Sequence, residues 1–119
     1  MAGIRVLIVE DQLLQMMALE GMLESLACVV VGTATSVDDG VSKAAALDFD
    51  IAIVDLKLRG QSGQAIVEEV ARRHIPMIIV SGYDLSAWQA GPDFRGEYVL
   101  LQKPFTFEEL RSAVLRALE

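Results

Sequence analysis

The sequence predicts an α/β protein with a doubly wound fold, in which a parallel sheet of five strands has helices on both faces. Three observations lead to this prediction. Short apolar runs alternate along the chain with stretches of good helix formers. The apolar runs contain no regular polar alternation, which is typical of strands buried on both faces of a sheet. The 119 residues, 53% of them hydrophobic, suit one domain with a substantial core, so we expect one domain over residues 1–119.

Apolar runs rich in Val, Ile and Leu predict the strands, at residues 4–9, 28–31, 51–54, 77–80 and 98–101. The first run is followed by the polar Glu10-Asp11, and the third ends at Asp55. The fourth ends at Ser81-Gly82. Cys28 opens the second run, so we expect it to be a small buried core residue rather than a reactive thiol.

Stretches of good helix formers between these runs predict the helices, at residues 12–27, 37–47, 64–74, 85–90 and 107–118. Ser36 and Thr106 are the expected N-caps, and Thr106 with Glu109 has the spacing of a capping box. Most of Met16, Met17 and Met22 are expected in the core. A loop with Gly60 and Gly63 is expected before the third helix.

Two further expectations concern the apolar face of the last helix and the ion pairs of the third helix. The last helix is expected to carry its apolar residues on one face, namely Phe107, Leu110, Val114, Leu115 and Leu118. In the third helix, Glu68 is expected to pair with Arg72 and Glu69 with Arg73, because residues four apart on a helix are neighbours.

The strict alternation of strand and helix implies parallel strands with right-handed crossovers. Five such units predict the flavodoxin-like (βα)5 arrangement, with strand order 2-1-3-4-5. In folds of this kind, ligands bind outside the carboxyl ends of the strands. The residues that follow the predicted strands are therefore the candidates for chemistry.

Composition excludes several functions. The formal net charge of −7 argues against binding to nucleic acid, which requires a basic surface. No apolar run approaches the ~20 residues that a membrane span needs, and the early sequence does not resemble a signal peptide. We therefore expect a cytoplasmic protein without nucleic-acid or membrane partners. No G-x-G-x-x-G follows the first strand, which argues against dinucleotide binding.

The strand ends place three carboxylates, from Glu10, Asp11 and Asp55, at one edge of the sheet. Carboxylates crowded in this way tolerate one another around a divalent cation, and oxygen ligands suit Mg²⁺. Lys103 and the hydroxyl of Ser81 are then placed to bind the oxygens of an anion near Asp55. A phosphoryl group on Asp55 is one such anion, because an ionised aspartate is a nucleophile in acyl-phosphate chemistry.

Structural alternatives exist for each of these residues. An isolated aspartate at the place of Asp55 most often caps the following loop. Glu10-Asp11 complements the dipole of the helix that follows, a role compatible with metal binding. Lys103 would ordinarily be a solvated surface lysine, but it lies between a buried strand and Pro104, which stiffens the loop. The combination of all these residues favours the functional interpretation.

With these residues the chain resembles the receiver domains of bacterial two-component response regulators. The matching positions are the acidic pair Glu10-Asp11, the acceptor Asp55, the hydroxyl residue Ser81 and the run that begins at Lys103-Pro104. The resemblance covers essentially the whole chain. It implies Mg²⁺-dependent transfer of a phosphoryl group from a phosphohistidine of a sensor histidine kinase or phosphotransfer protein to Asp55. It also implies that the backbone carbonyl of Lys57 completes the metal shell.

The chain departs from the family pattern at a switch position. Most receivers have Tyr or Phe three residues before the lysine, whereas this chain has Leu100. Tyr98 and Tyr83 are the nearest candidates to replace the missing aromatic residue or to modulate the reaction rate. Several segments resemble the stand-alone FAT GUY receivers of alphaproteobacterial stress signalling, namely residues 81–83, 94–96 and 101–105. Residues 77–81, however, lack the aromatic-rich strand that named that subgroup.

The resemblance also sets expectations for how a signal leaves. No output domain is expected, so the chain would signal by protein contact or serve as a phosphate shuttle or sink. The expected contact face combines the helix at 85–90 with the strand at 98–101 and the last helix. As a monomer or weak dimer, the chain would catalyse at most its own phosphotransfer and autodephosphorylation.

Two other functions are alternatives to phosphoryl acceptance. A phosphorylation-independent interaction module that keeps the receiver fold is the main alternative, and Leu100 favours it. A phosphatase of the haloacid dehalogenase type ranks last. Such enzymes need an acidic residue two positions after the nucleophile, where this chain has Lys57.

Overall fold

The computed structural model describes residues 1–82 and 96–119, so the helix expected at 85–90 lies outside the described residues. The strands are β1 (Arg5–Val9), β2 (Val29–Ala34), β3 (Ile51–Asp55), β4 (Lys57–Leu58), β5 (Gln61–Ser62), β6 (Met77–Ser81) and β7 (Tyr98–Gln102). The helices are α1 (Leu13–Ser25), α2 (Val37–Ala46), α3 (Gln64–Arg72) and α4 (Phe107–Ala117). Among these described helices, none has the length and apolar character needed to cross a membrane.

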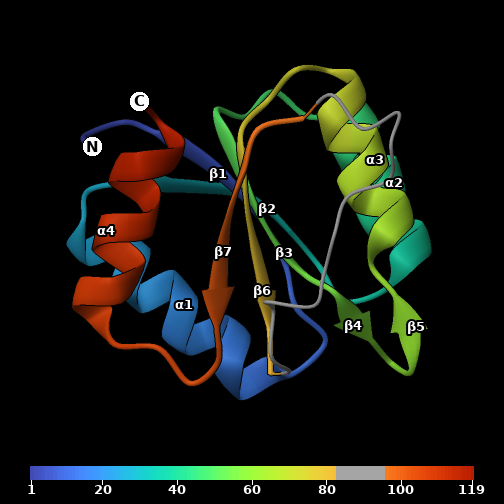
Figure 1. Cartoon of the computed structure of the whole chain (residues 1–119), viewed down its shortest axis with the longest axis horizontal. Coiled ribbons are helices and arrows are strands. Elements are labelled where there is room, and N and C mark those ends of the chain that lie inside the picture. The colour runs from blue at the N-terminus through green and yellow to red at the C-terminus, as the bar shows by residue number, and fades with distance from the viewer. Residues whose placement is uncertain (83–95) are drawn as a thin grey trace.

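The described residues form three layers, with a parallel sheet between two pairs of helices (Figure 1). The five-stranded sheet has the order β2-β1-β3-β6-β7. Because β4 and β5 form a separate hairpin, this is the predicted order 2-1-3-4-5, and the flavodoxin-like prediction is confirmed. Helices α1 and α4 cover one face, and α2 and α3 cover the other (Figure 1).

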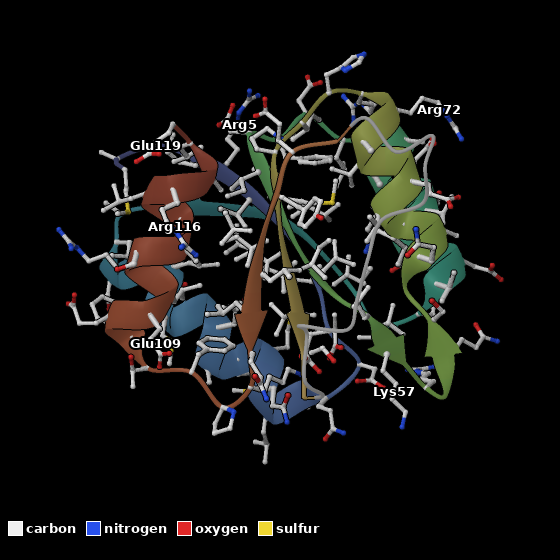
Figure 2. The ribbon with its side chains drawn as sticks, viewed as in Figure 1. Arg5, Lys57, Arg72, Glu109, Arg116 and Glu119 are labelled. Carbon is white, nitrogen blue, oxygen red and sulfur yellow. The ribbon has the colours of Figure 1, made fainter. Side chains whose placement is uncertain are left out.

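Side chains from the strands fill both spaces between the layers (Figure 2). Successive residues of β1 alternate between them: Val6 and Ile8 pack toward α1 and α4, and Leu7 and Val9 toward α2 and α3. Every residue of β3 and β6 is buried, as their uninterrupted apolar sequence predicted. Cys28 is buried in the core beside α1, so its structural assignment is confirmed.

Both predicted helix caps are present. The Ser36 hydroxyl oxygen accepts from the Asp39 N–H at 3.2 Å. At α4, the Thr106 hydroxyl oxygen accepts from the Glu109 N–H at 3.1 Å, and the Glu109 carboxylate accepts from the Thr106 N–H at 2.9 Å. This reciprocal pair is the predicted capping box.

The core faces of α1 and α4 differ in part from the prediction. In α4 the buried positions include Ala113 and Ala117, and these small residues allow the helix to lie close to the sheet. Phe107 and Leu115 point away from this face and are 36% and 42% exposed, so the predicted apolar face was wrong at these two residues. In α1, Met17 is likewise 58% exposed. Met16 is buried, and Met22 packs against the core from a partly buried position, so the prediction that most of these methionines lie in the core is confirmed.

The loop expected after β3 contains a short antiparallel hairpin. Lys57 pairs with Ser62, and Leu58 pairs with Gln61. The two residues between these strands, Arg59 and Gly60, have positive φ values of 51° and 79°. Tight two-residue hairpin turns require this conformation, which glycine adopts readily and arginine rarely does.

The pairing predicted for α3 was wrong in detail. Arg72 pairs with Glu69, three residues earlier. Arg73 follows the last residue of α3, and its side chain extends to α2. Its Nη1 donates to the carbonyl oxygens of Ala44 and Leu47, each at 2.7 Å. Its guanidinium carbon lies 5.3 Å from the centroid of the Phe49 ring. Arg73 therefore satisfies carbonyl groups at the C-terminus of α2, which have no partner inside that helix.

We expect Arg73→Met to lower the free energy of unfolding by about 2 kcal/mol, because two carbonyl groups lose a charged donor and a cation–π contact is lost. Arg72→Met is the matched control. Its side chain is 74% exposed in an ion pair, and it should change stability by less than about 0.5 kcal/mol. Urea unfolding of both variants measures the difference, and equal midpoints would contradict the assigned role.

Candidate functional site

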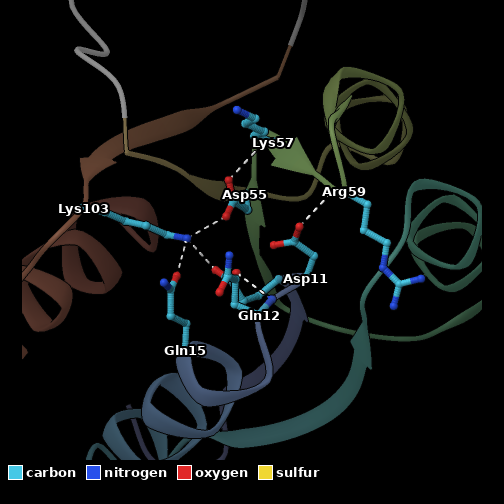
Figure 3. Close-up of polar contacts among 8 residues, drawn as sticks. Asp11, Gln12, Gln15, Asp55, Lys57, Arg59 and Lys103 are labelled. Atoms are coloured by element: carbon cyan, nitrogen blue, oxygen red, sulfur yellow. Dashed lines mark hydrogen bonds and ion pairs between the residues drawn. The ribbon is translucent and has the colours of Figure 1, made fainter.

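The carboxyl ends of four neighbouring strands bring the predicted residues to one edge of the sheet (Figures 1 and 3). Glu10 and Asp11 follow β1, and Asp55 is the last residue of β3. Ser81 ends β6, and Lys103 follows β7. These residues are far apart in the chain, so it is the parallel pairing of the strands that brings them together.

Three carboxylates form a compact cluster. Glu10, Asp11 and Asp55 each place one carboxylate oxygen so that the three oxygens lie within 4.8 Å of one another. Glu10 and Asp55 are only 4% and 6% exposed, and Asp11 is partly exposed. Like charges so close and so poorly hydrated repel strongly unless cations compensate them.

Lys103 supplies one compensating charge. Its Nζ donates to Asp55 Oδ2 at 2.6 Å, to Glu10 Oε2 at 2.7 Å and to Gln15 Oε1 at 2.7 Å (Figure 3). An ammonium group has three hydrogens, so all three are used by these acceptors. Lys103 reaches the cluster from the loop after β7, and its peptide bond to Pro104 is cis.

The pKa directions agree with this geometry. Burial raises the pKa of the Glu10 carboxyl, and the hydrogen bond from Lys103 opposes that shift only in part. For Lys103, burial alone would lower the pKa, but Asp55 and Glu10 together outweigh burial and raise it above its usual range. The ammonium therefore stays protonated, and the site retains a fixed positive charge beside Asp55.

Backbone N–H groups fix the orientation of each carboxylate (Figure 3). Asp55 Oδ1 accepts from the Lys57 N–H at 2.9 Å, and Glu10 Oε1 accepts from the Gln12 N–H at 3.1 Å. Asp11 Oδ2 accepts from the Arg59 N–H at 2.7 Å. The β4–β5 turn thus holds Asp11 in place, and its backbone donors need no particular side chain.

The donor set of this cluster fits Mg²⁺, which prefers a few carboxylate oxygens and keeps several waters. Glu10, Asp11 and Asp55 are the residues that would hold the ion. A polar cleft opens beside them, lined among others by Gln12, Lys57 and Lys103. The metal ligands, including the backbone carbonyl of Lys57, remain predictions.

The structure also describes four other candidate residues, namely Ser81, Pro104, Leu100 and Tyr98. Ser81 is 2% exposed, and its backbone carbonyl accepts from the Lys103 N–H at 2.8 Å, which ties the end of β6 to the lysine loop. Pro104 lines an apolar cavity next to Lys103. In β7, Leu100 packs partly buried toward α2 and α3, whereas Tyr98 is 38% exposed.

Tyr83 lies outside the described residues. Two other residues of the site were not identified from the sequence. Gln15 is an exposed polar residue in the first turn of α1, and its position in the sequence did not mark it as a partner of Lys103. The sequence could not indicate Arg59 either. Arg59 contributes its backbone N–H, which every residue except proline has.

Gly63 lies directly against the backbone of Asp55 and Leu56. A Cβ atom at this position would lie 2.4 Å from the backbone oxygen of Asp55 and 3.3 Å from the Cα of Leu56. The N–H of Gly63 also donates to the Leu56 carbonyl at 2.7 Å. The start of α3 can therefore approach the end of β3 this closely only because residue 63 has no side chain.

We expect Gly63→Ala to lower the free energy of unfolding by about 3 kcal/mol, because the methyl group overlaps the backbone of Asp55. Gly21→Ala is the matched control. Gly21 is exposed in α1, and its added Cβ would meet no atom within 4 Å, so that variant should gain up to about 1 kcal/mol. Thermal or urea unfolding should give opposite signs, and a neutral Gly63→Ala would refute the close approach.

Comparisons with known proteins agree with this geometry. A family model for the response regulator receiver domain matches residues 6–115. The solution structure of SdrG from Sphingomonas melonis Fr1 is 32% identical, with a TM-score of 0.80, and the match covers 100% of this chain and 99% of that chain. The receiver domain of the sensor histidine kinase PA1611 from Pseudomonas aeruginosa PAO1 is 26% identical, with a TM-score of 0.82 and 98% coverage of both chains. That structure has a magnesium ion coordinated in its active site cleft.

Among curated proteins, the probable C4-dicarboxylate response regulator DctR of Halalkalibacterium halodurans is 28% identical over 120 residues. The match covers 93% of this chain and 50% of that protein. The chain spans half the length or less of the curated relatives it matches. The family model nevertheless covers nearly the whole chain, including the strand ends that carry Glu10, Asp11, Asp55 and Lys103. The chain therefore belongs to the response regulator receiver domain family.

Proposed function

We propose that this receiver domain accepts a phosphoryl group on Asp55 from the phosphohistidine of a sensor histidine kinase or phosphotransfer protein. Mg²⁺ held by Glu10, Asp11 and Asp55 is the proposed cofactor. The observation that supports this most directly is the placement of the Lys103 ammonium, 2.6 Å from Asp55 Oδ2 and beside a cluster of three carboxylates. A buried acceptor with a fixed cation next to it is suited to a group that carries negative charge.

In the proposed reaction, a carboxylate oxygen of Asp55 provides the electron pair of the new P–O bond. The P–N bond of the donor breaks, and its electron pair stays on the histidine nitrogen. Asp55 needs no proton transfer, because it attacks as the carboxylate. When bound, Mg²⁺ would supply positive charge to the phosphoryl oxygens. Lys103, whose Nζ contacts Asp55 Oδ2, would stabilise the same charge, and the Lys57 N–H holds the acceptor carboxylate in position.

The proposal extends to signalling. Ser81 is buried and directly connected to the lysine loop, so its hydroxyl is the proposed partner of the new phosphoryl oxygens. The exposed side of β7 and α4, which includes Tyr98 and Arg116, is the proposed surface for a downstream protein. We further propose a monomer or weak dimer in the cytoplasm that acts by contact or as a phosphate shuttle or sink. Its catalysis would be limited to its own phosphotransfer and autodephosphorylation, and FAT GUY membership stays a prediction.

A second candidate is an interaction module that works without phosphorylation. It is favoured by Leu100, an aliphatic residue that packs partly buried where most receivers have a movable aromatic ring. The two functions differ in one measurable respect. The module should bind its partner equally well as the wild type and as Asp55→Ala, whereas the switch should lose phosphorylation-dependent binding in that variant.

The proposed function is tested by titrating the wild-type protein with Mg²⁺ and then with beryllium fluoride, followed by NMR. We expect beryllium fluoride to bind only in the presence of Mg²⁺, with shifts in the amide signals of Asp55, Ser81 and Lys103 that extend into β7. Incubation with acetyl phosphate should add the mass of one phosphoryl group. Failure of both experiments at saturating Mg²⁺ would refute the proposal.

A further inference from the structure

The contact between Gln15 and Lys103 joins two elements that the rest of the site leaves separate (Figure 3). Gln15 lies in the first turn of α1, and Lys103 lies in the loop after β7. The Gln15 Oε1 atom accepts from Lys103 Nζ at 2.7 Å, as short as the distance from Nζ to Glu10. Gln15 also lines both the polar cleft and the apolar cavity beside Lys103, so its side chain stands between them.

The three acceptors of the ammonium are not equivalent. Glu10 and Asp55 belong to the carboxylate cluster, whose oxygens the proposed cation and phosphoryl group would also use. The Gln15 amide oxygen is uncharged and belongs to α1, whereas the clustered oxygens are carboxylate oxygens. Of the three acceptors of Lys103, Gln15 is therefore the neutral one, and its hydrogen bond depends least on the charge that a cation or phosphoryl group would share.

We propose that Gln15 is a positioning residue, which keeps the Lys103 ammonium at the mouth of the cleft while the two carboxylates are engaged by the cation and the phosphoryl group. The inference rests on the function proposed above. Without Gln15, the ammonium would be held only by carboxylates whose charge is shared with the cation. A mobile ammonium stabilises an incoming anion less well, because the group must be ordered at the moment of binding.

The test uses Gln15→Met, which keeps the length of the side chain but lacks the amide oxygen. Gln61→Met is the matched control, since Gln61 is exposed in β5 and lies outside the residues that line the cleft. In Gln15→Met, beryllium fluoride affinity at saturating Mg²⁺ should fall about tenfold, the usual worth of one hydrogen bond to a charged group. Mg²⁺ affinity should stay within about twofold, since Gln15 is not among the clustered carboxylates. Gln61→Met should leave both affinities unchanged.

A second readout does not depend on phosphoryl chemistry. Nitrogen-15 relaxation of the Lys103 ammonium, measured in the metal-free protein, should show greater mobility in Gln15→Met than in the wild type. Gln15→Glu should restore the order, because its carboxylate can accept the same bond. Unchanged ammonium mobility together with unchanged beryllium fluoride affinity in Gln15→Met would overturn the inference. If the wild type itself fails to bind beryllium fluoride, the proposed function fails, and the relaxation data still decide whether Gln15 orders Lys103.

Discussion

Asp55→Asn is expected to abolish phosphoryl acceptance completely. The amide has nearly the same shape as the carboxylate, but its oxygen is not a nucleophile at neutral pH. The substitution also removes one of the three charges of the cluster, so Mg²⁺ affinity should fall about tenfold. Lys103 keeps Glu10 and Gln15 as acceptors in this variant, and the fold should be retained.

Mass spectrometry after incubation with acetyl phosphate and Mg²⁺ measures the first effect directly. Asp48→Asn is the matched control, because the same change is made to a side chain that is 85% exposed and precedes β3 at the opposite edge of the sheet. This control should be phosphorylated like the wild type. A phosphoryl adduct of undiminished yield on Asp55→Asn would assign the acceptor to another residue and contradict the proposed function.

The sequence was sufficient for the parts of the fold that depend on periodicity and on local caps. Uninterrupted apolar runs identified β1, β3 and β6, and the capping box marked the start of α4 within one residue. The orientation of helices was harder, because residues such as Leu115 and Ala113 are both apolar enough for a core position. Which of them faces the sheet depends on how closely the helix can approach, and the small residue was buried.

The site was predictable for a related reason. Parallel strands bring their carboxyl ends together, so side chains at those ends meet regardless of their distance in the chain. This rule predicts that Glu10, Asp55 and Lys103 meet in one cluster, and the structure brings them together. The rule cannot predict the backbone groups that orient the carboxylates, such as the Arg59 N–H that donates to Asp11, because every residue except proline has this donor. Arg73, for its part, left its helix for acceptors 26 and 29 residues away.

Lys103→Met should separate the role of the ammonium from that of the metal. Removal of this charge takes away the cation proposed to bind the phosphoryl oxygens, so the rate of phosphoryl acceptance should fall about 10²–10³-fold. Mg²⁺ affinity should rise instead. In the wild type, the Lys103 ammonium competes with Mg²⁺ for the oxygens of Glu10 and Asp55, and the variant lacks this competitor. Opposite changes in these two quantities are difficult to obtain from misfolding.

The same variant has an expected pH dependence of stability. Burial already raises the pKa of Glu10, and loss of the opposing lysine raises it further. A carboxyl whose pKa is higher in the folded than in the unfolded state binds protons more tightly when folded, so stability increases as the pH falls. The destabilisation of Lys103→Met at neutral pH should therefore shrink as the pH is lowered through the raised pKa of Glu10. Saturating Mg²⁺ should also reduce it, because the ion binds only the folded state.

Lys57→Met is the control that decides whether contact or merely nearby charge matters. It removes one positive charge from the lining of the same cleft, but Lys57 is exposed and contributes its backbone N–H to Asp55, which methionine retains. Phosphoryl acceptance should change by less than about threefold, since an exposed charge is screened by solvent. If both lysine variants lost acceptance equally, the positive field of the cleft would be the cause, and the direct contact of Lys103 with Asp55 would not be.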